Sequence, residues 1–297
     1  MKLAFILNPA ANRGSKADRW KKLEDEIRRE WPEAPIEYSK GKGDIESKAR
    51  ILAGSSEAVV VAGGDGSVQE LFRGLSGTGC LAGLIPAGSG NDFARCLGIP
   101  RDPARVVREL RGYGIRGVDG VKMTIDGIES SFINNLGIGF NGWANHYASS
   151  STYLWGSLKY LSAVIQTLFR YHGQSFTIQV DGNDCSDHAL LITIANGSTE
   201  GGGFQIAPEA NPSDGYLDLV VINAMPVWKL LIRLPFLFFK NQPSFKNIKR
   251  YRCKHVIIRS EYGTAAHADG EKLGLTIRNF ETEIRSAEVS FLCPGNN

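Results

Sequence analysis

One short loop combines glycines with an acid at the junction of a strand and a helix. Val59–Val61 form an uncharged β-branched run, which is typical of a strand buried on both faces of a parallel sheet. Gly63-Gly64-Asp65-Gly66 follows, and the apolar spacing behind it predicts a helix from about Ser67. Glycines there let the backbone approach phosphate oxygens, while the helix N-terminus offers free N–H groups. The loop is a candidate anion site that contains a carboxylate; a tight turn needing positive φ is the alternative.

Three more loops of this kind follow expected strands. One runs Asn8-Pro9-Ala10-Ala11-Asn12-Arg13, another begins at Ser39, and the third is Gly88-Ser89-Gly90-Asn91-Asp92. Each joins a strand to a helical pattern, and this alternation predicts an open, doubly wound α/β domain. Ligands of such sheets bind at the carboxyl ends of the strands, so we expect the loops to converge on a nucleotide site. The expected strands are 3–7, 36–38, 59–61 and 81–85.

In the second half, strands joined by tight turns replace the alternation of strands and helices. Asp126-Gly127 and Asp181-Gly182 each lie between two alternating segments, which is a strong hairpin signal. We therefore expect an antiparallel β-sandwich domain that also contains a helix over 152–172. The expected boundaries are 1–118 with a returning strand at about 286–297 for the α/β domain, and 119–285 for the β domain.

The bulk composition restricts the class of protein. A chain of 297 residues has room for two cores, and a net charge of +3 gives no strong field for nucleic acid, so no nucleic-acid partner is expected. The five cysteines are odd in number and widely spaced, which fits a reducing cytoplasm. The longest apolar stretch, 225–240, contains Lys229, Arg233 and Pro235 and is shorter than the ~20 residues that span a bilayer. We expect a cytoplasmic protein.

The same stretch has the composition of a segment that lies at a membrane surface. Aromatic and aliphatic residues alternate with cations in it, and a basic run follows that would attract anionic headgroups. We expect peripheral association with a membrane; an amphipathic helix that covers the sheet or forms a homodimer contact is the alternative. The apolar residues are Trp228, Leu231, Ile232, Phe236, Phe238 and Phe239, and the basic run is Lys246, Lys249, Arg250, Arg252 and Lys254.

Taken in order, several motifs resemble the diacylglycerol kinase catalytic-domain family, and specifically its small bacterial lipid kinases. They are GGDGS at 63–67, PAGSGNDFAR at 86–95 and HADGE at 267–271, supported by NPAANRG, the VDG at Asp119 and EANPSDGYLDL. The resemblance spans essentially the whole chain. The family usually has Thr where Ser67 and Ser89 stand. PAGSGN is also similar to sphingosine kinases, and the Gly-Gly-Asp-Gly loop is similar to that of NAD kinases.

The resemblance implies an N-terminal NAD kinase-like domain and transfer of phosphate from ATP, with Mg²⁺, to a lipid hydroxyl. Diacylglycerol is the expected acceptor; the alternatives are a sphingoid-base kinase, an NAD-kinase-like kinase, and a regulatory protein that binds nucleotide without turnover. Phosphoryl transfer needs positioning and charge neutralisation more than covalent help, which the loops above suit. By position, the nucleotide would contact Asn8 to Arg13, Ser39, Gly63 to Ser67 and Ser89.

The resemblance also implies roles for individual acids. Asp269 or Glu271 would act as general base, and Asp65 would hold Mg²⁺ or position the nucleotide. Asp119 would support the base; an ordinary strand-end residue is the alternative. From spacing alone, Asp269-Gly270 indicates a further hairpin turn. Because His267 is next to the base that the resemblance implies, we expect it to support that base. A structural Mg²⁺ would lie at Asn211, Asp214 and Tyr216, where a satisfied turn is the alternative.

Overall fold

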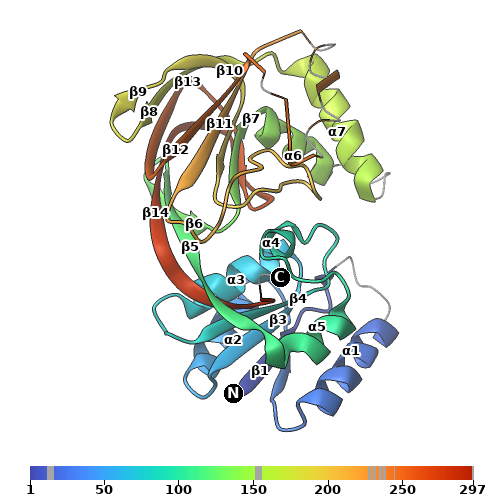
Figure 1. The fold of residues 1–297 in the computed structure, drawn as a ribbon. Coiled ribbons are helices and arrows are strands. Elements are labelled where there is room, and N and C mark those ends of the chain that lie inside the picture. Colours follow the sequence, from blue (N-terminus) through green and yellow to red (C-terminus); the bar gives the residue numbers. More distant parts are fainter. Residues whose placement is uncertain are drawn as a thin grey trace. The chain divides into compact units, whose positions relative to one another are not determined.

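The computed structural model divides the chain into two compact units (Figure 1). The N-terminal unit is Met1–Asp119 with Ser286–Asn297, and the C-terminal unit is Gly120–Arg285. The structure describes residues 1–11, 17–150, 156–226, 229, 232–233, 236, 239–243 and 245–295.

The N-terminal unit is built on a parallel sheet whose strand order is β4-β3-β1-β2. Every residue of β1 and β3 is buried, as the uncharged apolar runs predict for strands covered on both faces. Phe5 of β1 is paired with Ile36 of β2 on one side and with Val60 of β3 on the other. The predicted doubly wound α/β domain is therefore confirmed. The strands are β1 (Leu3–Leu7), β2 (Ile36–Tyr38), β3 (Ala58–Gly63) and β4 (Leu81–Pro86).

Helices cover both faces of this sheet, with α2 and α3 on one face and α1 and α5 on the other (Figure 1). Trp20, Leu23 and Ile27 form the buried face of α1, as their spacing predicts. The helix after the glycine loop begins at Asp65, two residues before the predicted start, because the N–H groups of Ser67 and Val68 already donate to Gly64 O. The helices are α1 (Ala17–Glu30), α2 (Asp44–Ala53), α3 (Asp65–Leu75), α4 (Asp92–Cys96) and α5 (Pro103–Glu109), followed by a 3-10 turn, η2 (Leu110–Gly112).

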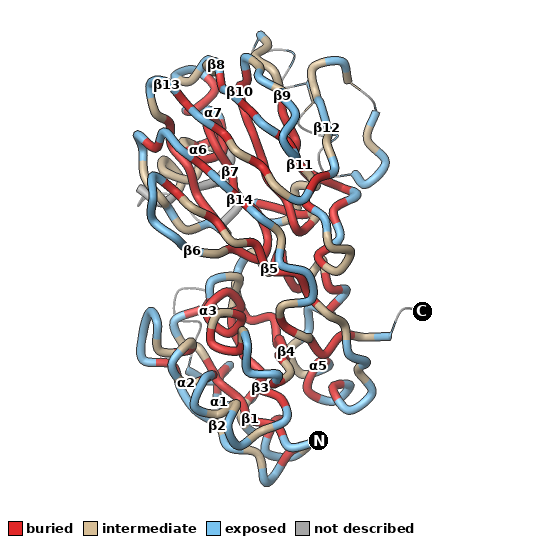
Figure 2. Tube along the Cα trace, turned by 90° about the vertical axis from the view of Figure 1, so that its left-hand side faces the viewer, coloured by how far each residue is buried: buried red, intermediate tan, exposed pale blue. Residues whose placement is uncertain are grey.

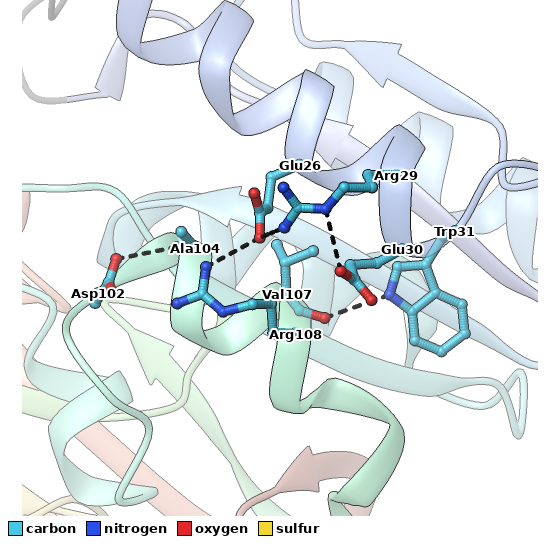
Figure 3. A network of polar contacts seen from close by, with 8 residues as sticks. All are labelled: Glu26, Arg29, Glu30, Trp31, Asp102, Ala104, Val107 and Arg108. Atoms are coloured by element: carbon cyan, nitrogen blue, oxygen red, sulfur yellow. Dashed lines mark hydrogen bonds and ion pairs between the residues drawn. The ribbon is translucent and has the colours of Figure 1, made fainter.

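Polar contacts fix α5 against α1 (Figure 3). Trp31 Nε1 donates to Val107 O at 3.4 Å, and Arg108 pairs with Glu26 at 3.0 Å. Asp102 caps α5, because its carboxylate accepts the N–H of Ala104 at 3.1 Å. The α5 helix, which follows β4 and its glycine loop, is thereby held at a defined place on the sheet.

The chain returns to the N-terminal unit at its end, as predicted. Phe291, near the end of β14 (Glu271–Cys293), is paired in parallel with Ala82 of β4. Its ring packs against Phe72 and Phe93, with ring centroids 6.5 and 5.8 Å apart. The last strand thereby adds an aromatic anchor to the core of the α/β unit.

The C-terminal unit is an antiparallel, sandwich-like β structure, as predicted. Its strands follow the order β12-β11-β10-β7-β13-β14, β5 pairs β14 and β6, and β8 pairs β10, β13 and β9. Buried residues run along β10 and β11 (Figure 2). The strands are β5 (Gly114–Ile125), β6 (Ile128–Phe132), β7 (Asn135–Gly139), β8 (Gln174–Val180), β9 (Asn183–Asp184), β10 (Asp187–Ala195), β11 (Leu217–Asn223), β12 (Ile248–Cys253) and β13 (His255–Ala268).

Two helices pack on this sheet where one was predicted. The apolar pattern predicts a strand that continues through Phe140, but β7 ends at Gly139, whose φ of 78° turns the chain out of the strand. Helix α6 (Phe140–Ser150) begins there, and α7 (Gly156–Arg170) covers most of the predicted 152–172 helix. A second core, which includes Phe140, Leu168 and Val220, forms where these helices meet the sheet.

Three Asp-Gly turns have the same backbone conformation. Both residues are left-handed in Asp126-Gly127 (φ 46° and 85°), Asp181-Gly182 (47° and 84°) and Asp269-Gly270 (48° and 82°). This is the type I′ turn that matches the twist of a two-residue hairpin. The second turn joins β8 to the short β9, and not directly to β10 as predicted.

Candidate functional site

The glycine loop at 63–66 lies against the glycine loop at 88–92, and the two backbones are in direct contact. A Cβ atom on Gly64 would lie 3.1 Å from the Cα of Gly88, and one on Gly88 would lie 2.4 Å from the Cα of Gly64. A Cβ on Gly63 would lie 2.3 Å from Ser67 Oγ. These positions have no room for a side chain, so the glycines bring two strand-end loops together at the N-termini of α3 and α4.

The other two loops lie at the same edge of the sheet. Asn8 Nδ2 donates to Ser67 Oγ at 2.9 Å, and Asn8 Oδ1 accepts the N–H of Ala10 at 3.1 Å. The N–H of Ser39, a buried residue, donates to Leu7 O at 2.8 Å. Thus Asn8, Pro9, Ala10, Ala11, Ser39, Gly63 to Ser67 and Gly88 to Asp92 gather at the carboxyl ends of the strands, while Asn12 and Arg13 lie outside the described residues.

Two acids stand at the helix N-termini of this edge. The Asp65 carboxylate accepts the N–H of Phe93 at 3.0 Å, and Arg95 pairs with Asp92 at 2.5 Å. Burial raises the pKa of Asp65, and the negative charge of Asp92 raises it further. Asp65 and the buried Asp92 are therefore neighbouring carboxylates, and carboxylate oxygens are the ligands that Mg²⁺ prefers.

In the C-terminal unit, Asp269 is held by backbone donors at its hairpin turn. Its Oδ1 accepts the N–H groups of Asn134 and Asn135, and its Oδ2 accepts that of Ile133, each at 2.9 Å. These donors stabilise the ionised carboxylate and fix its orientation. Asn145 Nδ2 on α6 donates to Gly270 O at 2.9 Å, so the helix missed from the sequence also supports this turn.

The other two Asp-Gly turns use their carboxylates in the same way. Asp126 accepts the N–H of Asn279 at 2.8 Å, and Asp181 accepts that of His255 at 2.8 Å. Asp126 and Asp181 are exposed, whereas Asp269 is half-buried. The reading of Asp269-Gly270 as a hairpin turn is therefore right, and any catalytic role of Asp269 is additional to that structural one.

The remaining predicted acids have separate surroundings. Asp119 is buried in the N-terminal unit, and its carboxylate accepts the N–H of Ala287 at 2.7 Å, which fixes the returning strand. Glu271 is the first residue of β14 and is paired with Ala268.

The predicted structural metal turn contains a second carboxylate, Asp218, besides Asp214. Asp214 accepts the N–H of Tyr216 at 3.0 Å and pairs with Arg252 at 3.0 Å, while Asn211 is exposed. Burial, and then the charge of Asp214, raises the pKa of Asp218 to about 6. Asp214 and Asp218 are therefore two neighbouring carboxylates at this turn. In the described part of the chain, no group of three or more His, Cys, Asp or Glu side chains is arranged for a metal ion.

The polar residues around Asp269 were also missed. Asn134 and Asn135 lie in what reads as a continuous strand, and two adjacent asparagines are unusual in a buried strand. That pair of asparagines is the feature of the sequence that indicates a polar site here. Glu200, which pairs with His267 at 2.8 Å, has no such signal in the sequence, because its partner is distant along the chain.

The chain thus combines an α/β unit that has glycine-rich strand-end loops with an antiparallel β unit. Residues 2–123 match the diacylglycerol kinase catalytic domain, and residues 134–289 match the YegS C-terminal NAD kinase beta sandwich-like domain. The chain belongs to the diacylglycerol kinase catalytic-domain family, as its motifs predict.

Relatives of the chain are similar over most of its length. A diacylglycerol kinase from Mycobacterium tuberculosis is 31% identical over 242 residues, which are 77% of this chain and 76% of that protein. The putative lipid kinase YtlR from Bacillus subtilis is 25% identical over 292 residues, 92% of this chain and 94% of that protein. The crystal structure of a putative diacylglycerol kinase from Bacillus anthracis str. Sterne, 23% identical, covers 98% of this chain and 96% of its own with a TM-score of 0.79, so the fold is shared.

Proposed function

We propose that the protein is an ATP-dependent lipid kinase that transfers the γ-phosphate to the hydroxyl of diacylglycerol, forming phosphatidic acid. The observation that carries this proposal is the contact of the two glycine loops in the N-terminal unit, backbone against backbone, with two acids at their helix N-termini. Such loops offer N–H donors to phosphate oxygens. Family membership and the names of the relatives support a lipid as the acceptor.

Each residue set would have a defined task in this reaction. The loops at 8–13, 39, 63–67 and 88–92 would bind ATP, and Asp65 with Asp92 would hold Mg²⁺, which neutralises charge on the phosphates. Asp269 would take the proton of the acceptor hydroxyl as its oxygen bonds to the γ-phosphorus and the bond to ADP breaks. Glu271 is the alternative base. Asp119 would support this chemistry by fixing the returning strand, and Asp214 with Asp218 would hold the structural Mg²⁺.

We propose further that the protein docks on anionic membranes through the segment 225–240 and the basic run of Lys246, Lys249, Arg250, Arg252 and Lys254. Ile232 and Phe239 are each 61% exposed, and Phe236 is 38% exposed. Trp228, Leu231 and Phe238 lie outside the described residues. Among the helices that the structure describes, none has the length and apolar character needed to span a bilayer. A homodimer contact at this segment is the alternative.

Release of ADP with purified acceptors tests the proposed function. Diacylglycerol in mixed micelles should stimulate ADP release well above the rate with ATP alone, while sphingosine and NAD should not. Stimulation by sphingosine alone would reassign the acceptor. Binding of ATP with no stimulation by any acceptor would indicate a regulatory protein and would overturn the kinase proposal.

A further inference from the structure

His267, two residues before Asp269, forms a buried acid–base pair with Glu200. His267 Nε2 is 2.8 Å from Glu200 Oε1, and the two residues are only 3% and 8% exposed. Asn141 Nδ2 donates to Glu200 Oε2 at 3.1 Å and to Thr193 Oγ1 at 3.0 Å. Apolar residues of similar volume would serve stability as well or better at such a place, because the buried polar groups lose their hydration. The presence of this pair therefore calls for a functional reason.

The position of the His267 ring is narrowly defined. His267 is paired with Gly137 of β7, and a Cβ on Gly137 would lie 2.5 Å from His267 Nε2 and 2.8 Å from Asn141 Cβ. The imidazole therefore packs directly on the backbone of β7. Any side chain at position 137 would displace either the ring or Asn141.

Glu200 is adjacent to the residue that anchors the donors to Asp269. Thr199 O accepts Asn134 Nδ2 at 3.0 Å and Asn135 Nδ2 at 2.9 Å. The backbone N–H groups of the same two asparagines donate to Asp269 Oδ1. The two-residue segment 199–200 therefore holds His267 through Glu200, and holds the backbone that orients Asp269 through Thr199.

A similar pair beside another Asp-Gly turn provides a contrast. His255 Nε2 is 2.9 Å from Glu281 Oε1, and the N–H of His255 donates to Asp181. These side chains are 36% and 54% exposed, so water competes for every bond. Of the two pairs, the one that accompanies Asp269 is buried and joined to a network.

We propose that Glu200 and His267 are positioning residues for the base, which they serve by fixing the 199–200 segment and, through Asn134 and Asn135, the Asp269 carboxylate. This inference rests on the proposed function. Loss of the pair frees the segment, and the carboxylate then samples orientations that do not reach the acceptor hydroxyl. Because ATP binds at the loops of the N-terminal unit, its affinity is unaffected.

The test compares Glu200→Ala with Glu200→Gln and with the control Glu281→Ala, using ATP and dioleoylglycerol micelles. Glu200→Ala should lower kcat about 10- to 100-fold, the range expected when a reacting group is misplaced, with KM for ATP changed by less than about twofold. Glu200→Gln should recover most of kcat, because the side chain keeps its size and its carbonyl oxygen still accepts from Asn141 Nδ2, as Glu200 Oε2 does. Glu281→Ala should match the wild type.

Hydrogen exchange at the amides of 133–135 gives a second readout that does not need turnover. These amides should exchange at least about 10-fold faster in Glu200→Ala than in the wild type, and at the wild-type rate in Glu281→Ala. A wild-type kcat and unchanged exchange in folded Glu200→Ala would overturn the inference, as would a Glu200→Gln variant with no recovery. If the wild type phosphorylates no lipid, the proposed function fails, while the exchange rates still decide whether Glu200 orders this backbone.

Discussion

Replacing Asp269 by Asn separates the structural role of this residue from its proposed catalytic role. The Asn carbonyl can take the place of Oδ1 and keep the bonds from Asn134 and Asn135, but its NH₂ group then faces the N–H of Ile133. One charge-assisted bond is lost, which costs about 1.5 to 3 kcal/mol. In a unit of this size that is a fall in Tm of about 3 to 12 °C. Removing a general base should lower kcat about 10²- to 10⁴-fold.

Asp126→Asn and Asp181→Asn are the matched controls. Both place an amide in the same type I′ turn and disturb the same kind of carboxylate-to-backbone bonds, at exposed positions. We expect each to lose about 1 kcal/mol of stability and to keep kcat within about threefold of the wild type. The assay is transfer of labelled γ-phosphate to dioleoylglycerol, with Tm measured on the same preparations. A folded Asp269→Asn enzyme with near-wild-type kcat, or an equal loss in Asp126→Asn, would refute the reasoning.

Three further changes address the nucleotide edge and the membrane. Because burial and the charge of Asp92 raise the pKa of Asp65, the wild type should lose stability as pH rises from the ordinary carboxyl range through the raised folded value. Asp65→Asn should therefore gain Tm relative to the wild type across that interval while losing activity, and a lower Tm than the wild type at neutral pH would contradict this. Gly88→Ala places a Cβ 2.4 Å from the Gly64 backbone, so it should weaken ATP binding at least about 10-fold; unchanged calorimetric affinity would contradict the loop packing. Phe239→Asp should reduce flotation with anionic liposomes, and unchanged flotation of the folded variant would remove the docking proposal.

Local patterns were sufficient for much of the fold. The uncharged runs at 3–7 and 59–61 and the Asp-Gly turns act over a few residues, so they predict strands and hairpins from the sequence. Helix α6 was missed because the apolar pattern runs on through Phe140, and only the positive φ of Gly139 ends the strand. The apolar spacing predicts the start of α3 two residues too late, because the hydrogen bonds to Gly64 O determine where the helix begins.

The positions of the candidate site residues were predictable where a motif is contiguous. The four loops could be assigned to one edge because parallel strands end together. The hydrogen bonds that orient Asp269 could not be predicted, since Asn135 and Thr199 are 64 residues apart and meet only through the strand pairing. The raised pKa of Asp218 likewise depends on burial, which the sequence does not state.

Incubation of the protein with γ-labelled ATP and a total lipid extract tests the central claim most directly. The wild type should yield a labelled lipid that is identified as phosphatidic acid, and Asp269→Asn should yield little of it. Label that appears only on NAD, or on no acceptor at all, would contradict the account.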